Sequence, residues 1–306
     1  MPVWQPSIPQ RLQPHLLSWV GYDFASTEAV HHGVPSMGVT VVLSLAEPID
    51  CGWLDGGERQ LLDVLASGLH TAPALIQSRG RQQGLELSIH PLSARRLLGL
   101  PAGALAGLMV DVTDLQWPPH LLDQLRQSTW LGRFQLLAAF LTKRLEQHPH
   151  TPRADMVEAL ARIHQARGTI PIADLARDVG LSRRRLSSLF NLETGLSPKQ
   201  VARIARFEHA KKLVQSGALP SDIAAAAGYS DQAHLSREWR SMTGWTLRQS
   251  RADFPLLQDA QALQGQGCSH DETTAVSLPA LHRCRSRHQL PSSHRLHHGD
   301  GRAGPG

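Results

Sequence analysis

Residues 228–244 read GYSDQAHLSREWRSMTG and have the features of a helix that follows a tight turn. Leu235 and Trp239 recur at the i, i+4 spacing of one helical face. Gly228 can adopt the left-handed conformation that ends a preceding helix, and Ser230 can cap the next one. The stretch therefore predicts a helix-turn-helix unit. Its exposed face would carry polar residues: Gln232, Ser236, Arg237 and Arg240.

The same pattern occurs earlier in the chain, at residues 172–195, which read IADLARDVGLSRRRLSSLFNLETG. Gly180 and Gly195 match Gly228 and Gly244 at offsets of 48 and 49 residues, which indicates a duplicated unit. In this earlier copy, Ser182 is the expected cap of the second helix. Leu186, Leu189 and Phe190 would face inward. The exposed face would carry Arg183, Arg184, Arg185, Ser187 and Ser188.

A single long helix is predicted between the copies, in residues 197–217, SPKQVARIARFEHAKKLVQSG. Ser197 is the expected N-cap, Pro198 occupies the first helical position, and Gly217 ends the helix. Its roughly 18 residues would span about 27 Å. With its flanking turns, such a linker can separate two recognition helices by about 34 Å, one turn of DNA.

Positive charge is concentrated in the same part of the chain. Residues 153–254 hold 16 Lys and Arg against 10 Asp and Glu, whereas residues 1–152 hold 10 against 12. A basic excess of this kind suits a polyanionic partner, although a solvated basic face produces the same count. Short polar and cationic side chains on a protruding helix are suited to the major groove.

Residues 154–250 resemble the DNA-binding domain of the AraC/XylS family of bacterial transcription regulators, through both repeats and the GLSPKQVARIARFEHA linker. The resemblance implies sequence-specific binding to double-stranded promoter or operator DNA, contact with RNA polymerase, and a cytoplasmic, nucleoid-associated activator. It leaves two further partners open, a small-molecule effector and a second copy of the chain. Leu247 and Ser250 depart from the family pattern, which puts the docking of the last helix in question. An ordinary helical bundle with solvated arginines is the competing interpretation.

The N-terminal part has the pattern of a β-rich domain with helices. Residues 15–24, 37–46 and 85–91 are rich in β-branched or alternating apolar residues, which is typical of strands. A later helix carries an apolar stripe that favours a core position over a dimer contact: Leu131, Phe134, Leu137, Leu141 and Leu145. The order of elements resembles the sensor-like domain of some AraC-type regulators. We therefore expect an α+β effector domain at 1–150 and an all-α DNA-binding domain at 153–254, with Pro149 and Pro152 at the junction.

Residues 255–306 are predicted to form a disordered tail, because they contain few large apolar residues and no sustained period. Six of the 17 histidines lie there without a fixed ligand spacing, so no specific metal site is expected. No stretch of the sequence has the apolar length of a membrane span. The three cysteines, Cys51, Cys268 and Cys284, are too far apart to suggest a disulfide framework or a compact zinc site.

No catalytic motif is found in the N-terminal part: it has no G-x-S-x-G, H-E-x-x-H, glycine-rich phosphate loop or CxxC. His31 and His32 are adjacent, but neighbours on a strand point to opposite faces and are poorly placed to share a metal. We expect Cys51 to be a buried structural thiol, and the alternative is a reactive thiol. We expect no enzyme activity and no cofactor. The alternative function is a DNA-targeted enzyme or repair protein with a catalytic N-terminal domain.

Overall fold

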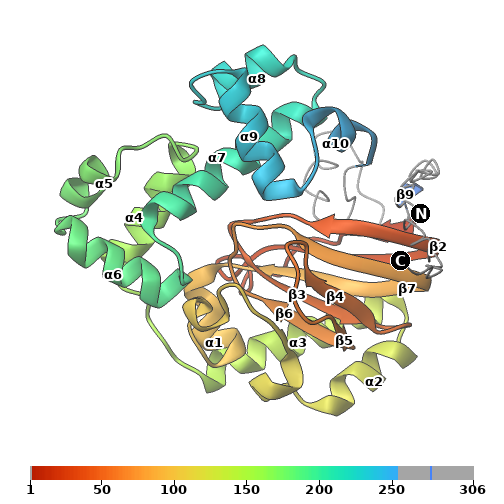
Figure 1. Cartoon of the computed structure of the whole chain (residues 1–306). Helices are drawn as coiled ribbons and strands as arrows, with labels where there is room; N and C mark the ends of the chain where they lie inside the picture. The colour runs from red at the N-terminus through yellow and green to blue at the C-terminus, as the bar shows by residue number, and fades with distance from the viewer. Residues whose placement is uncertain (1, 254–275, 278–306) are drawn as a thin grey trace, which may run out of the picture.

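The computed structural model describes residues 2–253 and 276–277, which form a β-rich N-terminal part followed by a helical C-terminal part (Figure 1). The sheet lies beneath the last helices, and another set of helices covers its other side (Figure 1). Among the described residues, no helix is both long and apolar enough to cross a membrane. The tail predicted at 255–306 lies outside the described residues, apart from the two-residue strand β9 (Val276–Ser277).

Two long strands form the centre of the sheet. Strand β2 (Leu16–Gly33) pairs antiparallel with β7 (Ala74–Ile89) from Leu16↔Ile89 to Gly33↔Ala74. On its other edge, β7 pairs first with β4 (Ile49–Trp53) and then with β3 (Val39–Ser44). Because β7 changes partner along its length, the sheet divides there, and this division forms one side of the pocket described below. The shorter strands extend the edges: β1 (Pro2–Trp4), β5 (Gln60–Leu62), β6 (Val64–Ser67) and β8 (Met109–Asp111).

The three predicted strand regions correspond to parts of β2, β3 and β7. The sequence did not reveal β4, β5, β6 or β8, because each has only three to five residues. A strand of that length shows too few alternations to give a pattern.

Several helices follow the last long strand. Their bounds are η1 (Pro91–Ser93), α1 (Ala94–Leu98), η2 (Ala102–Leu105), η3 (Val112–Leu115), α2 (Pro119–Gln127) and α3 (Trp130–Gln147). Phe134 of α3 packs edge-on against Trp19 of β2, with 5.1 Å between ring centroids. Through this aromatic contact, the long helix α3 packs against the sheet.

The predicted stripe on α3 is correct at four positions and wrong at Leu131. The other four side chains are buried: Phe134, Leu137, Leu141 and Leu145. Leu131 is 63% exposed because Trp130 takes the inward place in the first turn, where its ring stacks on Trp4 at 3.8 Å. The stripe therefore belongs to the core of the N-terminal part, except at its first residue.

Seven helices are described in the C-terminal part: α4 (Ala154–Gln165), α5 (Ile172–Asp178), α6 (Arg183–Thr194), α7 (Pro198–Gln215), α8 (Pro220–Ala226), α9 (Gln232–Thr243) and α10 (Leu247–Asp253). Gly180 and Gly228 end α5 and α8 with φ of 69° and 73°, in the left-handed region that glycine adopts without steric cost. Pro149 and Pro152 both fall between α3 and α4.

The helix caps explain where α6, α7 and α9 begin. Ser182 accepts a hydrogen bond from the Arg185 amide at 3.2 Å, and Ser197 forms a capping box with Gln200 at the start of α7. The cap predicted at Ser230 is wrong. Asp231 is the N-cap of α9 and accepts from the His234 amide at 2.6 Å, because the second copy carries one extra residue after its turn.

Candidate DNA-reading surface and ligand pocket

Helix α6 separates its side chains into a buried and an exposed face. Leu186, Leu189 and Phe190 are buried in the same apolar cluster as the core of the N-terminal part. The residues predicted to contact DNA lie on the other side of the helix: Arg183, Arg184, Arg185 and Ser188 are exposed, and Ser187 is half-buried. The three arginines come in the first turn of α6, so their long side chains can reach a polyanion in front of the helix.

Helix α9 has the same division. Leu235 and Trp239 are fully buried, and Trp239 packs against Phe207 of α7 with ring centroids 5.2 Å apart. The four predicted contact residues are all exposed: Gln232, Ser236, Arg237 and Arg240. The apolar face therefore fixes α9 to α7, and the polar face is available to a ligand.

Ser250, one of the two departures from the family pattern, has a clear structural role. It is fully buried in α10, and its hydroxyl accepts a hydrogen bond from the Trp239 indole N–H at 2.8 Å. Leu247, the other departure, is half-buried and packs against the same apolar cluster. Both residues thus dock α10 on α9.

Two serine hydroxyls on these faces donate hydrogen bonds to carbonyls of their own helices. The Ser188 hydroxyl donates to the Arg184 carbonyl at 3.0 Å, and the Ser236 hydroxyl donates to the Gln232 carbonyl at 2.8 Å. A serine bonded in this way keeps lone pairs but has used its donor. The arginines and Gln232 therefore offer the stronger donors of this surface.

The arginines of the two faces are available for anions. Among the side chains that the structure describes, no ion pair joins a carboxylate to Arg183, Arg184, Arg185, Arg237 or Arg240. Some arginines away from the faces form ion pairs with carboxylates. Arg162 of α4 binds Asp178 at 3.0 Å, and Arg203 of α7 binds Glu238 of α9 at 2.6 Å. The exposed polar faces of α6 and α9 therefore carry positive charge that no ion pair of the described residues neutralises.

Both helix pairs also touch the N-terminal part. At the end of α6, Glu193 forms an ion pair with Arg95 at 3.2 Å. Gly195 lies so close to η2 that an added Cβ would sit 2.1 Å from the Ala106 Cβ. At the end of α9, the His32 ring stacks on Trp245 at 4.2 Å and bonds the Thr243 carbonyl at 2.7 Å. The N-terminal part is therefore in contact with the ends of both candidate reading helices.

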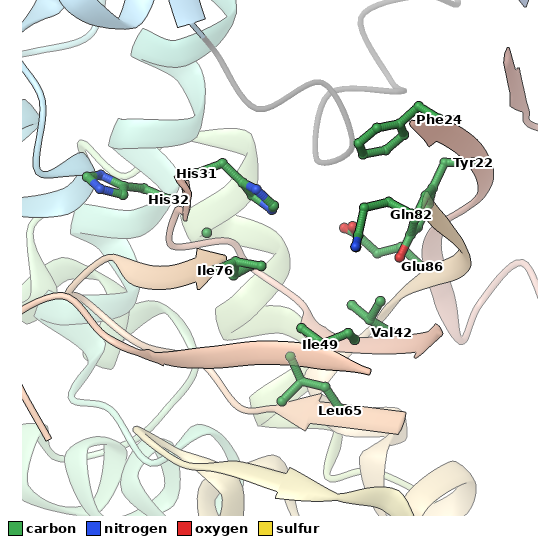
Figure 2. A pocket seen from close by; sticks show the side chains of 11 residues that line it. Tyr22, Phe24, His31, His32, Val42, Ile49, Leu65, Ile76, Gln82 and Glu86 are labelled. Atoms are coloured by element: carbon green, nitrogen blue, oxygen red, sulfur yellow. The ribbon is translucent and has the colours of Figure 1, made fainter. Parts of the chain in front are cut away.

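A pocket opens in the sheet beside this second contact (Figure 2). It has a volume of about 50 Å³ and opens to solvent. Its lining combines apolar side chains (Phe24, Val42, Ile49, Leu65 and Ile76) with polar ones (Tyr22, His31, His32, Gln82 and Glu86). Figure 2 shows the His31 ring turned toward this space and the His32 ring turned to the other side of the strand.

The electrostatics of the pocket follow from burial. Burial, with a smaller effect from His32, lowers the pKa of His31 to about 4, so this ring is neutral near pH 7. Burial and the nearby Glu86 carboxylate raise the pKa of Tyr22, so its hydroxyl stays protonated. Glu86 supplies the only carboxylate among the lining residues that the structure describes.

The alternation of residues along β7 is a sequence signal for this pocket. Gln82, Gly84 and Glu86 alternate along β7 with Leu85 and Leu87, which are fully buried on the opposite face. A strand with apolar residues on one face and Gln, Gly and Glu on the other indicates a polar cavity when both faces are covered.

Cys51 lies buried in β4, among Ile49, Leu62 and Leu65, as the structural-thiol interpretation predicted. Burial, with a smaller contribution from Asp50, raises the pKa of this thiol to about 11. A thiol with so high a pKa has little thiolate at neutral pH, which disfavours the alternative of a reactive cysteine. Among the described residues, no group of three or more His, Cys, Asp or Glu is arranged to hold a metal ion.

Two partly buried histidines, His31 and His70, make the stability of the fold depend on pH. Burial lowers the pKa values of His31 and His70 to about 4, whereas a histidine in an unfolded chain titrates near 6.5. As pH falls from 6.5 toward 4, the unfolded chain therefore binds protons at these histidines that the native state does not bind. The stabilisation is present above pH 6.5 and is lost below it, by roughly 2 kcal/mol per histidine at pH 5.

Urea denaturation at pH 7.5 and pH 5.0 measures this loss. In a His70→Gln variant, the difference between the two pH values is expected to shrink by about 2 kcal/mol. A pH dependence unchanged by that substitution would show that His70 is not held neutral by burial.

Comparison with known proteins bears directly on the helical part. Residues 175–253 match the family model described as a helix-turn-helix domain, and this range runs from α5 to α10. The arabinose operon regulatory protein of Escherichia coli (strain K12) is 32% identical over 124 residues, which cover 38% of this chain and 42% of that protein.

The chain carries a helix-turn-helix domain.

A second relative, the transcriptional activator NphR from Rhodococcus sp, is 31% identical to the chain over 153 residues, covering 47% of this chain and 44% of that protein. The chain thus spans less than half the length of these curated relatives. Among solved structures, ToxT from Vibrio cholerae superimposes with a TM-score of 0.49 at 10% identity, over 76% of this chain and 97% of that one. An AraC-type regulator from Chromobacterium violaceum matches 33% of this chain and 95% of its own at 27% identity, with a TM-score of 0.31.

Proposed function

We propose that the chain is a sequence-specific transcription regulator of the AraC type. In this proposal, α5–α6 and α8–α9 are two helix-turn-helix units, and α7 is the helix that joins them. The observation that carries the proposal is the repeated exposed polar face on α6 and α9, each backed by a buried apolar face within the matched helix-turn-helix domain.

The reading role is assigned to the exposed residues of both helices: Arg183, Arg184, Arg185, Ser187, Ser188, Gln232, Ser236, Arg237 and Arg240. Arginine can donate two parallel hydrogen bonds to guanine, and glutamine can pair with adenine in the same way. Residues 153–254 would form the DNA-binding domain and residues 1–150 the effector domain. The proposal also includes two protein partners, RNA polymerase and a second copy of the chain. It places the protein in the cytoplasm, at the chromosome.

The N-terminal part is assigned a sensing role because it contains the pocket and contacts the ends of both reading helices. A regulator of this kind needs an interaction whose strength differs between its two states. The contacts Arg95 to Glu193 and His32 to Thr243 cross from one part to the other and can be made or broken when the parts move.

Substituting Gln232 or Arg237 by alanine is expected to relax base preference at one position of the bound site. Each bidentate contact is worth about 1–3 kcal/mol of discrimination, so the preferred site should lose roughly 5-fold to 150-fold in affinity. Melting temperatures should stay within about 1 °C of wild type, because both side chains are exposed. Affinities of the full chain for the selected site and its single-base variants measure the effect.

Gln215→Ala is the matched control, since Gln215 is an exposed glutamine at the end of α7, away from both reading faces. If Gln232→Ala and Arg237→Ala weaken all sequences equally, these residues contact phosphates and the assigned orientation of α9 is wrong.

A further inference from the structure

One flank of α9 is held to α7 by an ion pair. The Nε of Arg203 in α7 donates a hydrogen bond to Oε1 of Glu238 in α9 at 2.6 Å. The two side chains are only 30% and 14% exposed, which makes this the least exposed ion pair within the described C-terminal part. A pair so shielded from solvent is screened by salt much less than a surface pair.

The Glu238 carboxylate depends on Arg203, because its second oxygen has no hydrogen bond. Among the described residues, Oε2 of Glu238 is buried without a partner, as are the Tyr229 hydroxyl and the Nε of Arg206. These groups lie together: the Arg206 guanidinium is 5.5 Å from the centre of the Tyr229 ring, and burial and the Glu238 carboxylate raise the pKa of that tyrosine. A buried carboxylate that loses its partner keeps the cost of its desolvation, so Arg203 and Glu238 act as a unit.

The first helix pair has no such ion pair at the equivalent position. Trp239 of α9 matches Phe190 of α6, so the residue that corresponds to Glu238 is Leu189. Leu189 is 3% exposed and lies in the apolar core that α6 shares with the N-terminal part. The same position is thus held by apolar packing in α6 and by an ion pair in α9.

The two kinds of contact restrict a helix differently. Apolar packing is not directional, so the buried stripe of Leu235, Trp239 and Met242 tolerates small rotations of α9 about its axis. A hydrogen bond is directional, and the one from Arg203 holds the Glu238 side chain in one direction. Because an α-helix turns by about 100° per residue, fixing Glu238 also fixes the direction in which Arg237 leaves α9.

We propose that Glu238 is a positioning residue, whose ion pair with Arg203 fixes the rotation of α9 so that Arg237 meets one base pair of the bound site. Arg203 and Glu238 touch no base themselves and act through Arg237. The base pairs read by α6 do not depend on this ion pair. The inference rests on the proposed function, because it requires that α9 reads DNA.

Four full-length chains test the proposal: wild type, Glu238→Gln, Arg203→Gln and the double variant. Affinities for the selected site and its single-base variants are measured where thermal melting shows each chain to be folded. The block of bases read by α9 is the one that Arg237→Ala relaxes. Each single substitution should lower discrimination in that block about threefold or more, and in the other block less than about twofold. The double variant should lose no more than either single variant.

Two results overturn the positioning role. Equal losses in both blocks would show that the ion pair only stabilises the fold or that Arg203 contacts phosphate. Additive losses in the double variant would show that Arg203 and Glu238 act independently. The matched control is Glu158→Gln, which removes an exposed ion pair with Arg162 inside α4 and should leave both blocks unchanged.

Arg203→Lys keeps the test decisive if a glutamine variant is unfolded at the assay temperature. Lysine retains the positive charge beside Glu238 but lacks the planar guanidinium whose Nε donates the hydrogen bond. This variant should also relax the block read by α9 and spare the other. A folded Arg203→Lys chain with unchanged preference in both blocks contradicts the proposal.

Failure of the positioning role and failure of the proposed function give different results. If the chain prefers no DNA sequence, the proposed function fails. Urea denaturation of the same four chains then still measures whether Arg203 and Glu238 stabilise the fold as a unit. If the chain selects two blocks but neither single substitution alters the block read by α9, the positioning role is wrong and the proposed function stands.

Discussion

Replacing Trp239 by alanine is expected to lower the free energy of unfolding by about 3–5 kcal/mol and to abolish DNA binding at temperatures where the variant unfolds. Trp239 is fully buried between α9 and α7, where it packs against Phe207 and donates a hydrogen bond to Ser250. Its removal leaves a cavity and an unpaired hydroxyl in the small core that fixes α9. Chemical denaturation of the full chain, followed by tryptophan fluorescence, measures the loss.

Leu219→Ala is the matched control, because Leu219 lies in the same helix pair but is 62% exposed. That change should cost less than about 0.5 kcal/mol. Trp239→Phe should fall between the two, since it keeps most of the ring and loses the hydrogen bond. If Trp239→Ala is as stable as wild type but alters one base preference, the inward and outward faces of α9 have been exchanged.

Replacing Gly195 by alanine is expected to cost about 2–4 kcal/mol. Part of the cost is the left-handed backbone, with φ of 72°, which a residue with a Cβ adopts at about 1–2 kcal/mol. The rest comes from overlap, because the new methyl group would lie 2.1 Å from the Ala106 Cβ and would push α6 away from η2. Thermal unfolding of the full chain measures the sum.

Gly180→Ala isolates the backbone part of this cost. Gly180 has nearly the same φ, 69°, but an added Cβ would meet nothing within 4 Å. Its substitution should therefore cost only about 1–2 kcal/mol. Adding Ala106→Gly to Gly195→Ala should recover part of the difference. Equal costs for Gly195→Ala and Gly180→Ala would contradict the close contact between α6 and η2.

The helices of the C-terminal part could be predicted because their signals are local. Ser182 and Ser197 cap the helices that follow them, and Leu235 and Trp239 repeat at helical spacing within a few residues. The error at Ser230 has the same origin, since Asp231 is an equally good cap one residue later. Local signals predict that a helix starts, but they locate its first residue only to within one position.

The pocket and the contacts between the two parts could not be predicted in this way. Tyr22 meets Gly84 only because β2 pairs with β7 in one particular register, and the sequence does not display that register. His32 and Trp245 are more than 200 residues apart, and their stacking depends on how the helical part lies on the sheet. The residue pattern therefore predicted which side chains of α6 and α9 are exposed, while the structure was needed to find the pocket.

Selection of bound sequences from a random duplex library with the full chain tests the central claim most directly. The account predicts two enriched blocks whose centres lie about 10 base pairs apart, one turn of DNA, since α6 and α9 would enter successive major grooves. Gln232→Ala should relax one position within one block and leave the other block unchanged. A library that is not enriched over its input, or enriched blocks that are indifferent to every substitution on α6 and α9, would contradict it.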